Sequence, residues 1–174
     1  EKLASTATII ATDASKLVNN APPKNLSWKS CQTLYFTANK RVIEKPMIGL
    51  VSKEDSLINS IFYHTSVATH SNNTEELLSV TVVKKHQLSE EQLIATVTKQ
   101  LKEECHIDTI TFLAIYSIKR ALPDLKDIKY EVSPSKTQLS SGIFLAGDVQ
   151  LNGSLNAAMI AGEKAALQVI ASLK

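Results

Sequence analysis

Apolar and polar residues alternate along much of the chain in a way that predicts a series of strands. The segments with two-residue alternation or a short apolar run are 4–12, 28–38, 47–51, 57–64, 77–83 and 111–118. A last run over 142–146 contains no polar side chain, which is typical of a central parallel strand buried on both faces. These patterns predict a protein rich in β-sheet.

The clearest helix signal covers residues 90–104. Ser89 is a candidate N-cap, and Gln92 follows it at the spacing of a capping box. Apolar side chains recur at helical spacing on one face of this segment, at Leu93, Ile94, Val97 and Leu101. We expect that face to pack against the core.

Two further helices are expected, one near each end of the chain. The first covers 14–20 and ends before Pro22, because proline cannot donate the helical hydrogen bond. The second covers 154–173, is rich in alanine and contains Gly162. Glycine in a helix interior costs about 1 kcal/mol relative to alanine. Its presence predicts close packing at this point, with the sheet as the candidate surface.

The order of these elements predicts an α+β or α/β fold with a mixed, largely antiparallel sheet. The chain leaves one sheet, builds an antiparallel lobe with a helix, and returns with a strand and a helix of the Rossmann-like type. We therefore predict three segments, 1–23, 24–136 and 137–174. The middle segment is an inserted lobe, and the outer two belong to one other domain.

Composition and charge exclude several classes of protein. The chain is 44% hydrophobic and 21% charged, as globular domains are. Its net charge of +2 is too balanced for a nucleic-acid-binding surface, so no nucleic-acid partner is expected. Apolar runs stay well below the roughly 20 residues of a membrane span, and no leader peptide is recognisable. We expect a cytoplasmic protein, with a membrane surface left open as a partner.

The sequence offers neither a metal site nor an identifiable catalytic residue. Cys31 and Cys105 lie far apart, and the four histidines are scattered. Two free buried thiols are the favoured interpretation, and a disulfide stays open. No serine–histidine–aspartate set or carboxylate pair can be picked out. Tyr35, Tyr63, Tyr116 and Tyr130 could line an apolar substrate cavity, although core and rim positions are the simpler interpretation. His64 and His70 flank a possible loop in the middle lobe, where a structural role is favoured over a catalytic one.

Residues 142–166 carry the candidate chemistry. The apolar strand runs into Gly147-Asp148, and open α/β sheets place their ligands at the carboxyl ends of strands. A carboxylate there can accept hydrogen bonds from sugar-like hydroxyls. The helix that begins near Ser154 offers N–H groups and the positive end of its dipole to an electron-rich ligand edge. An ordinary turn and simple helix capping are the alternatives.

This segment resembles the C-terminal FAD-binding motif of flavin-dependent amine oxidases, phytoene desaturases and related dehydrogenases. The matching residues are Ala146-Gly147-Asp148, Gly153-Ser154, Ala157-Ala158 and Ala161-Gly162-Glu163-Lys164-Ala165-Ala166. Two weaker matches to the family's strands occur at Ala7-Thr8-Ile9-Ile10-Ala11-Thr12-Asp13 and at Ile115-Tyr116-Ser117-Ile118-Lys119-Arg120-Ala121-Leu122-Pro123. The three matches follow the family order and span nearly the whole chain.

The resemblance implies FAD as the cofactor and hydride transfer to it from an apolar or amine substrate. In such families the acidic residue, here Asp148, contacts the ribityl or pyrophosphate region beside Gly147. The strand that contains Ala11 and Thr12 passes under the pyrophosphate. The helix start faces the pyrimidine edge of the isoalloxazine, and here it is formed by Ser154, Leu155, Asn156 and Ala157.

The same resemblance assigns roles to the three predicted segments. Residues 1–23 and 137–174 correspond to the FAD-binding domain, and 24–136 correspond to the substrate-binding lobe. The family's GxGxxG motif is not found among the five glycines of the chain. We therefore expect a missing N-terminal FAD-binding half as a partner, and no turnover by this stretch alone. A second hypothesis is a non-catalytic lobe, derived from a flavoprotein, that binds a lipid or a protein.

Overall fold

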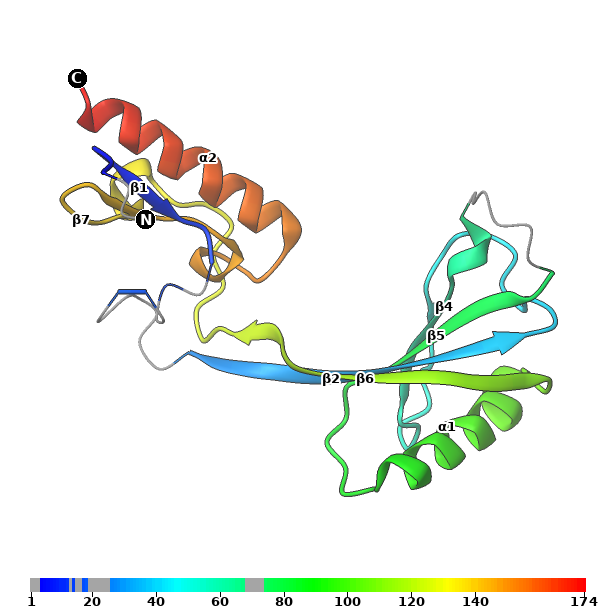
Figure 1. The fold of residues 1–174 in the computed structure, drawn as a ribbon. Helices are drawn as coiled ribbons and strands as arrows, with labels where there is room; N and C mark the ends of the chain where they lie inside the picture. Colours follow the sequence, from blue (N-terminus) through cyan, green and yellow to red (C-terminus); the bar gives the residue numbers. More distant parts are fainter. Residues whose placement is uncertain (1–3, 13, 15–16, 19–25, 68–73) are drawn as a thin grey trace. The chain divides into compact units, whose positions relative to one another are not determined.

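The computed structural model describes residues 4–12, 14, 17–18, 26–67 and 74–174. Figure 1 shows its elements, which are β1 (Thr8–Ile10), β2 (Ser27–Ala38), β3 (Gly49–Leu50), β4 (Ile58–Tyr63), η2 (His64–Ser66), β5 (Glu76–Val82), α1 (Glu90–Cys105), β6 (Ile110–Asp124), η3 (Pro134–Thr137), β7 (Gln138–Ser140), β8 (Ile143–Leu145), η4 (Asp148–Gln150) and α2 (Leu155–Ser172). The chain divides into two compact units. Unit 1 consists of Glu1–Lys29 and Leu122–Lys174, and unit 2 is Ser30–Ala121.

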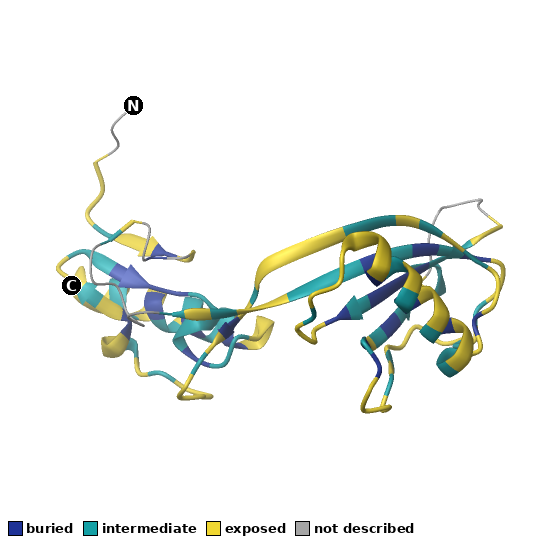
Figure 2. Ribbon diagram, turned by 90° about the horizontal axis from the view of Figure 1, so that it is seen from below, coloured by how far each residue is buried: buried dark blue, intermediate teal, exposed yellow. Residues whose placement is uncertain are grey.

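Unit 2 is built on an antiparallel five-stranded sheet with the order β3-β4-β5-β2-β6. Alternate side chains of β2 and β5 point to one face, where Leu34, Phe36 and Val80 are fully buried. The apolar face of α1 covers them with Leu93 and Val97, which are also fully buried. Figure 2 shows buried positions in dark blue both on the strands of this sheet and on α1. Burial of such side chains stabilises the unit by roughly 1.5–3 kcal/mol each.

Helix α1 forms as its sequence predicts. The Ser89 hydroxyl accepts a hydrogen bond from the Gln92 N–H at 3.3 Å, and the Gln92 side chain accepts one from the Ser89 N–H at 3.0 Å. This confirms the capping box. The helix ends at Cys105, and the next residue, His106, has a φ of 57° in the left-handed region that stops helices.

Unit 1 contains a three-stranded sheet with the order β1-β8-β7. Strand β8 is central, as its apolar composition predicts. It runs parallel to β1, with Ile9 opposite Phe144, and antiparallel to β7. Helix α2 buries a row of small side chains: Ala165 packs against Phe144 and Ala146, and Ala157 and Ala161 pack against Leu151 after η4. Because Ala165 is small, the helix backbone can approach Phe144 closely.

Several predicted boundaries differ from the structure. The strand expected over 4–12 is limited to β1, which pairs with β8 over only a few residues. The strand expected over 111–118 continues through Asp124, since β6 stays hydrogen-bonded next to β2 beyond the charged pair Lys119-Arg120. Strand β7 was not predicted because its sequence is polar. The helix expected over 14–20 includes residues outside the described ranges, and His70 lies outside them too.

The predicted packing of Gly162 against the sheet is wrong. A Cβ atom built on Gly162 has no neighbouring atom within 4 Å in the described part of the chain. The physical reason is its position around the helix. Ala157, Ala161 and Ala165 occupy the buried side of α2, where Ala165 meets the sheet, and Gly162 lies one residue further round.

Candidate flavin site

The parallel pairing of β1 with β8 brings two predicted site segments to the same edge of the sheet. Ile10 lies opposite Leu145, and the Ala146 N–H donates to the Ile10 carbonyl at 2.9 Å. Ala11-Thr12 therefore follows β1 where Gly147-Asp148 follows β8. The carboxyl end of a parallel sheet is where open α/β folds place their ligands.

Gly147 is needed here for its backbone conformation. Its φ of 104° is rarely adopted by residues that carry a side chain. Space is not the constraint, since a Cβ atom there would lie 4.0 Å from the Ala11 carbonyl oxygen. This conformation turns the chain from β8 into the single turn η4, which is closed by a hydrogen bond from the Gln150 N–H to the Gly147 carbonyl at 3.2 Å.

Asp148 anchors the loop through its backbone and leaves its carboxylate available. Its carbonyl oxygen accepts hydrogen bonds from the N–H groups of Leu151 and Gly153, both at 3.1 Å. The residue is half-buried. Within the described residues, no hydrogen bond or ion pair reaches its carboxylate. The carboxylate can therefore accept hydrogen bonds from hydroxyl groups of a ligand.

The first turn of α2 presents a limited set of backbone donors. The Ser154 hydroxyl accepts a hydrogen bond from the Ala157 N–H at 3.1 Å, and the Ser154 carbonyl accepts one from Ala158 at 3.0 Å. The Ala157 side chain is buried. Of the predicted helix-start residues, Leu155 and Asn156 keep N–H groups that have no acceptor within the helix. Leu155 is 78% exposed, so this end of the helix is open to a ligand.

Asn152 is a structural residue of the site that the sequence analysis missed. Its amide nitrogen donates to the Lys129 carbonyl at 3.0 Å, and its amide oxygen accepts from the Ser154 hydroxyl at 2.6 Å. The Lys129 N–H also donates to the Leu151 carbonyl at 3.1 Å. These bonds fasten the loop before α2 to the segment that follows β6. The Asn152-Gly153 pair, a common turn signal, was the available sequence clue.

A contact between Gly153 and Pro123 brings together two of the segments that resemble the family's motifs. Gly153 has a φ of 69°, and a Cβ atom there would lie 3.1 Å from Cγ of Pro123. Pro123 is buried, although its neighbours Leu122 and Asp124 in β6 are exposed. The proline of the second weak match therefore packs against the glycine that precedes α2.

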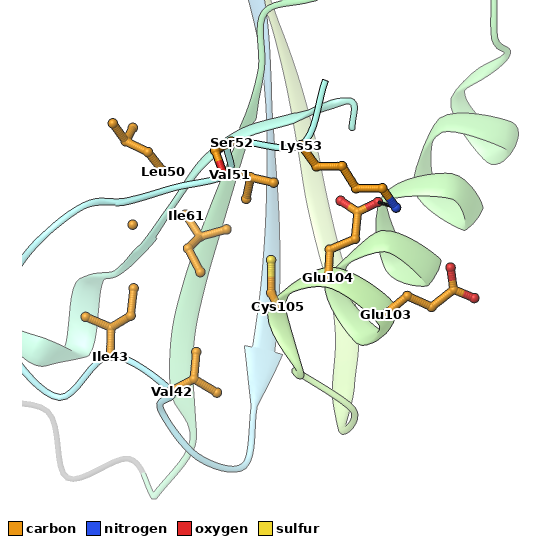
Figure 3. Close-up of a pocket in the computed structure, with 11 residues that line it drawn as sticks. Val42, Ile43, Leu50, Val51, Ser52, Lys53, Ile61, Glu103, Glu104 and Cys105 are labelled. Atoms are coloured by element: carbon orange, nitrogen blue, oxygen red, sulfur yellow. Dashed lines mark hydrogen bonds and ion pairs between the residues drawn. The ribbon is translucent and has the colours of Figure 1, made fainter. Parts of the chain in front are cut away.

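Unit 2 holds a separate cavity of about 440 Å³, shown in Figure 3. It is lined by Val42, Ile43, Gly49, Leu50, Val51, Ser52, Lys53, Ile61, Glu103, Glu104 and Cys105. Lys53 Nζ pairs with Glu104 Oε1 at 3.1 Å. None of the predicted site residues lines this cavity.

The ionisable groups of this cavity are only partly paired, since Glu104 Oε1 meets Lys53 Nζ while Glu104 Oε2 is buried without a hydrogen-bond partner in the described part of the chain. Burial raises the pKa of Glu104, but hydrogen bonds from Ser56 and Lys53 outweigh it, so the pKa lies below its ordinary value. Burial, and then the charge of Glu104, raise the pKa of the Cys105 thiol. Cys105 and Cys31 are both free and half-buried. The carboxylate is therefore charged and paired through one oxygen, and the Cys105 thiol is protonated at neutral pH.

The face of the unit 2 sheet opposite α1 carries a group of aromatic side chains. The ring of His64 lies 5.8 Å from that of Tyr35 and 5.0 Å from that of Phe62, and its Nε2 is 3.0 Å from the Ser79 hydroxyl. Tyr116 meets Tyr35 edge-on at 5.8 Å. The tyrosines do not form one group, because Tyr63 is buried in the core and Tyr130 belongs to unit 1. Burial also raises the pKa of Tyr63.

These features define an α+β protein that places a strand edge and a helix start together in unit 1. No model of a known protein family matches the sequence, and no curated protein sequence matches it. Solved structures share the fold. A protein from Exiguobacterium sp. 255-15, proposed to be a protoporphyrinogen oxidase, matches over 96% of this chain and 41% of its own, with 16% identity and a TM-score of 0.61.

An oxidoreductase from Methanosarcina mazei also shares the fold. It matches over 82% of this chain and 35% of its own, with 13% identity and a TM-score of 0.56. The chain thus has the fold of a part of these oxidoreductase chains and spans less than half of their length. This confirms, at the level of the fold, the resemblance to flavin-dependent oxidoreductases. In the described part of the chain, no helix is long and apolar enough to cross a membrane.

Proposed function

We propose that this chain is the substrate lobe and C-terminal flavin-binding part of an FAD-dependent oxidoreductase of the amine oxidase and phytoene dehydrogenase type. The proposed substrate is an apolar or amine-bearing small molecule. The missing N-terminal FAD-binding half would supply the main pyrophosphate and adenine contacts. The enzyme would act only when both parts are present.

The observation that carries the proposal is the open helix start beside the Gly147 turn. Two outward N–H groups, of Leu155 and Asn156, match the electron-rich pyrimidine edge of an isoalloxazine. The half-buried Asp148 carboxylate matches the hydroxyl groups of a ribityl chain or ribose. Ala11, the next residue along from β1, has no large side chain to obstruct a phosphate. The residues present therefore fit the cofactor.

The chain's own residues would contribute binding and orientation. When bound, FAD supplies the hydride acceptor. The N–H groups of Leu155 and Asn156 would donate hydrogen bonds to its pyrimidine edge and favour negative charge there. Asp148 would accept hydrogen bonds from its hydroxyl groups. No residue of this chain is assigned a proton-transfer role.

The substrate would meet unit 2 on the sheet face that α1 does not cover. Tyr35, Phe62, His64 and Tyr116 supply ring surfaces there, with the Ser79 hydroxyl held next to His64. Aromatic side chains offer large contact areas to apolar and amine-bearing molecules. This set supports the proposed substrate class.

The test is the visible spectrum of the complete gene product. We expect a yellow protein with flavin absorption. Replacing Asp148 with Asn should weaken flavin binding about tenfold or more, since a hydrogen bond to a charged group contributes about 1.5–3 kcal/mol. Asp55→Asn is the matched control, because Asp55 is exposed and belongs to unit 2. A yellow protein in which both variants bind flavin like the wild type would contradict the role of Asp148.

A second candidate function is a lobe that binds a lipid or a protein without redox chemistry. The exposed apolar side chains of α2, such as Leu155 and Met159, favour it. A complete gene product that is colourless and takes up no added FAD would support this candidate and refute the first.

A further inference from the structure

The cavity of unit 2 lies against the last turn of α1 and has a mostly apolar wall. Its volume is about 440 Å³, which is within the range of small-molecule sites, roughly 300–1,000 Å³. Figure 3 shows the lining side chains around one common space, and the apolar ones come from Val42, Ile43, Leu50, Val51 and Ile61. Leu50 is 77% exposed, so apolar surface continues from the wall to the outside of the unit. This lining suits the apolar body of a small ligand.

One carboxylate oxygen of Glu104 is buried at this cavity and receives no hydrogen bond. The Glu104 side chain is only 9% exposed, although it is charged at neutral pH. Its Oε1 pairs with Lys53 Nζ at 3.1 Å, whereas Oε2 has no partner in the described part of the chain. Figure 3 shows the unpaired oxygen turned away from Lys53, towards Val51. A buried carboxylate oxygen without a donor is costly, so a ligand that donates a hydrogen bond to Oε2 would be stabilised there.

A second unpaired polar atom lies close to the same wall. The Tyr63 side chain is 1% exposed, and its hydroxyl group has no hydrogen-bond partner among the described residues. Burial raises the pKa of Tyr63, and it is also influenced by Cys105 and by the backbone of Val42, which lies near without the geometry of a hydrogen bond. Val42 and Cys105 both line the cavity. Within the described ranges, the buried side-chain atoms that lack a partner are thus both found at this cavity.

The charges around Oε2 favour a neutral ligand over a charged one. Lys53 already balances the charge of Glu104, and the charge of Lys84 also acts on this carboxylate. The Glu103 side chain is 56% exposed, so water and salt screen its charge. A ligand ammonium would lose its hydration beside Lys53, and a ligand carboxylate would be repelled by Glu104. A hydroxyl group can donate to Oε2 without either cost, and its oxygen can accept a hydrogen bond in turn.

We propose that this cavity binds a small neutral alcohol with an apolar body, whose hydroxyl group donates a hydrogen bond to Glu104 Oε2. The apolar body would lie against Val51 and Ile61 and would cover the thiol of Cys105, which lines the same space (Figure 3). The site shares no residue with the candidate flavin site. It therefore does not depend on the proposed function.

Calorimetric titration of the complete gene product with octanol tests the proposal, with octylamine and octanoate as charged counterparts of the same chain length. Octanol should bind more tightly than either ion. Glu104→Gln should weaken octanol binding about tenfold, because a hydrogen bond to a charged acceptor is lost. Glu103→Gln is the matched control, since it makes the same change one residue earlier on an exposed side chain, and it should leave the affinity for octanol unchanged.

The two cysteines give a second readout that needs no variant. Both are free and half-buried, and Cys105 lines the cavity whereas Cys31 does not. With octanol at about ten times its Kd, alkylation of Cys105 by iodoacetamide should slow about tenfold, because only the unoccupied protein reacts. Alkylation of Cys31 should keep its rate. Peptide mass spectrometry reads both cysteines in the same sample.

Three results would overturn the proposal. The first is octanol that leaves the alkylation of Cys105 unchanged or binds the wild type and Glu104→Gln equally, which would leave a cavity that holds only water. The second is tighter binding of octylamine than of octanol. The third is binding by the 174-residue chain but not by the complete gene product, since another segment would then fill the cavity. None of these readouts involves flavin, so a colourless protein that binds octanol refutes only the proposed function.

Discussion

The same substitution, glycine to alanine, should have opposite effects at two positions of unit 1. At Gly162 the new methyl group enters open space, and alanine removes the helix-interior cost of glycine. At Gly153 the backbone has a φ of 69°, and the methyl group would lie 3.1 Å from Cγ of Pro123. Both variants add one methyl group, so the difference between their free energies of unfolding reports the backbone conformation and the space available at each position.

The expected magnitudes follow from these environments. Gly162→Ala should stabilise the 174-residue chain by about 0.5–1 kcal/mol. Gly153→Ala should destabilise it by about 1–2 kcal/mol, because an L-residue in the left-handed region costs about that much and the buried proline ring has no free end to move aside. For a chain of this size, about 1 kcal/mol corresponds to about 2–4 °C in Tm. The two Tm values should therefore move apart.

Urea unfolding followed by far-UV circular dichroism measures both effects. The midpoint should rise for Gly162→Ala and fall for Gly153→Ala, with unchanged slopes. A destabilised Gly162→Ala chain would refute the reasoning, since it would mean that another part of the 174-residue chain already packs against Gly162.

Three further outcomes are expected. Because the folded-state pKa of Glu104 is lowered, its contribution to stability is present above the ordinary glutamate pKa of about 4.3 and lost as pH falls below it. Glu104→Gln should therefore lower the urea midpoint at pH 7 and flatten its decline between neutral and acidic pH. The Cys105 thiol, whose pKa is raised by burial, should react slowly with iodoacetamide at pH 7.5 and faster at higher pH, as followed by mass spectrometry. Ser154→Ala should cost about 1 kcal/mol by loss of the helix cap, and Ser154→Asp should restore most of it in the same urea assay.

Local signals in the sequence were enough for α1 and β2 of unit 2, whereas β6 runs past its predicted range and β3 is shorter than predicted. Helix α1 was predicted within a residue of its ends, because its cap, its apolar stripe and its charges all act within a few residues. Strand β2 was predicted almost as well from its alternation. Strand β7 was missed, since its polar residues form a strand only where β8 supplies the hydrogen bonds.

In the candidate site too, some features follow from local sequence and others only from the tertiary structure. The sequence by itself indicated the Gly147-Asp148 turn and the helix start at Ser154, because glycine conformation and helix capping are local properties. Only the tertiary structure decided that Ala11 lies beside Gly147, that the Ala157 N–H is already bonded to Ser154, and that Asn152 is held by Lys129. It also decided that Gly162 faces away from the sheet. These contacts depend on which backbone groups, distant in the sequence, come together when β1 pairs with β8 and when the loop before α2 closes. The order of residues within one segment does not specify which distant segment it will contact.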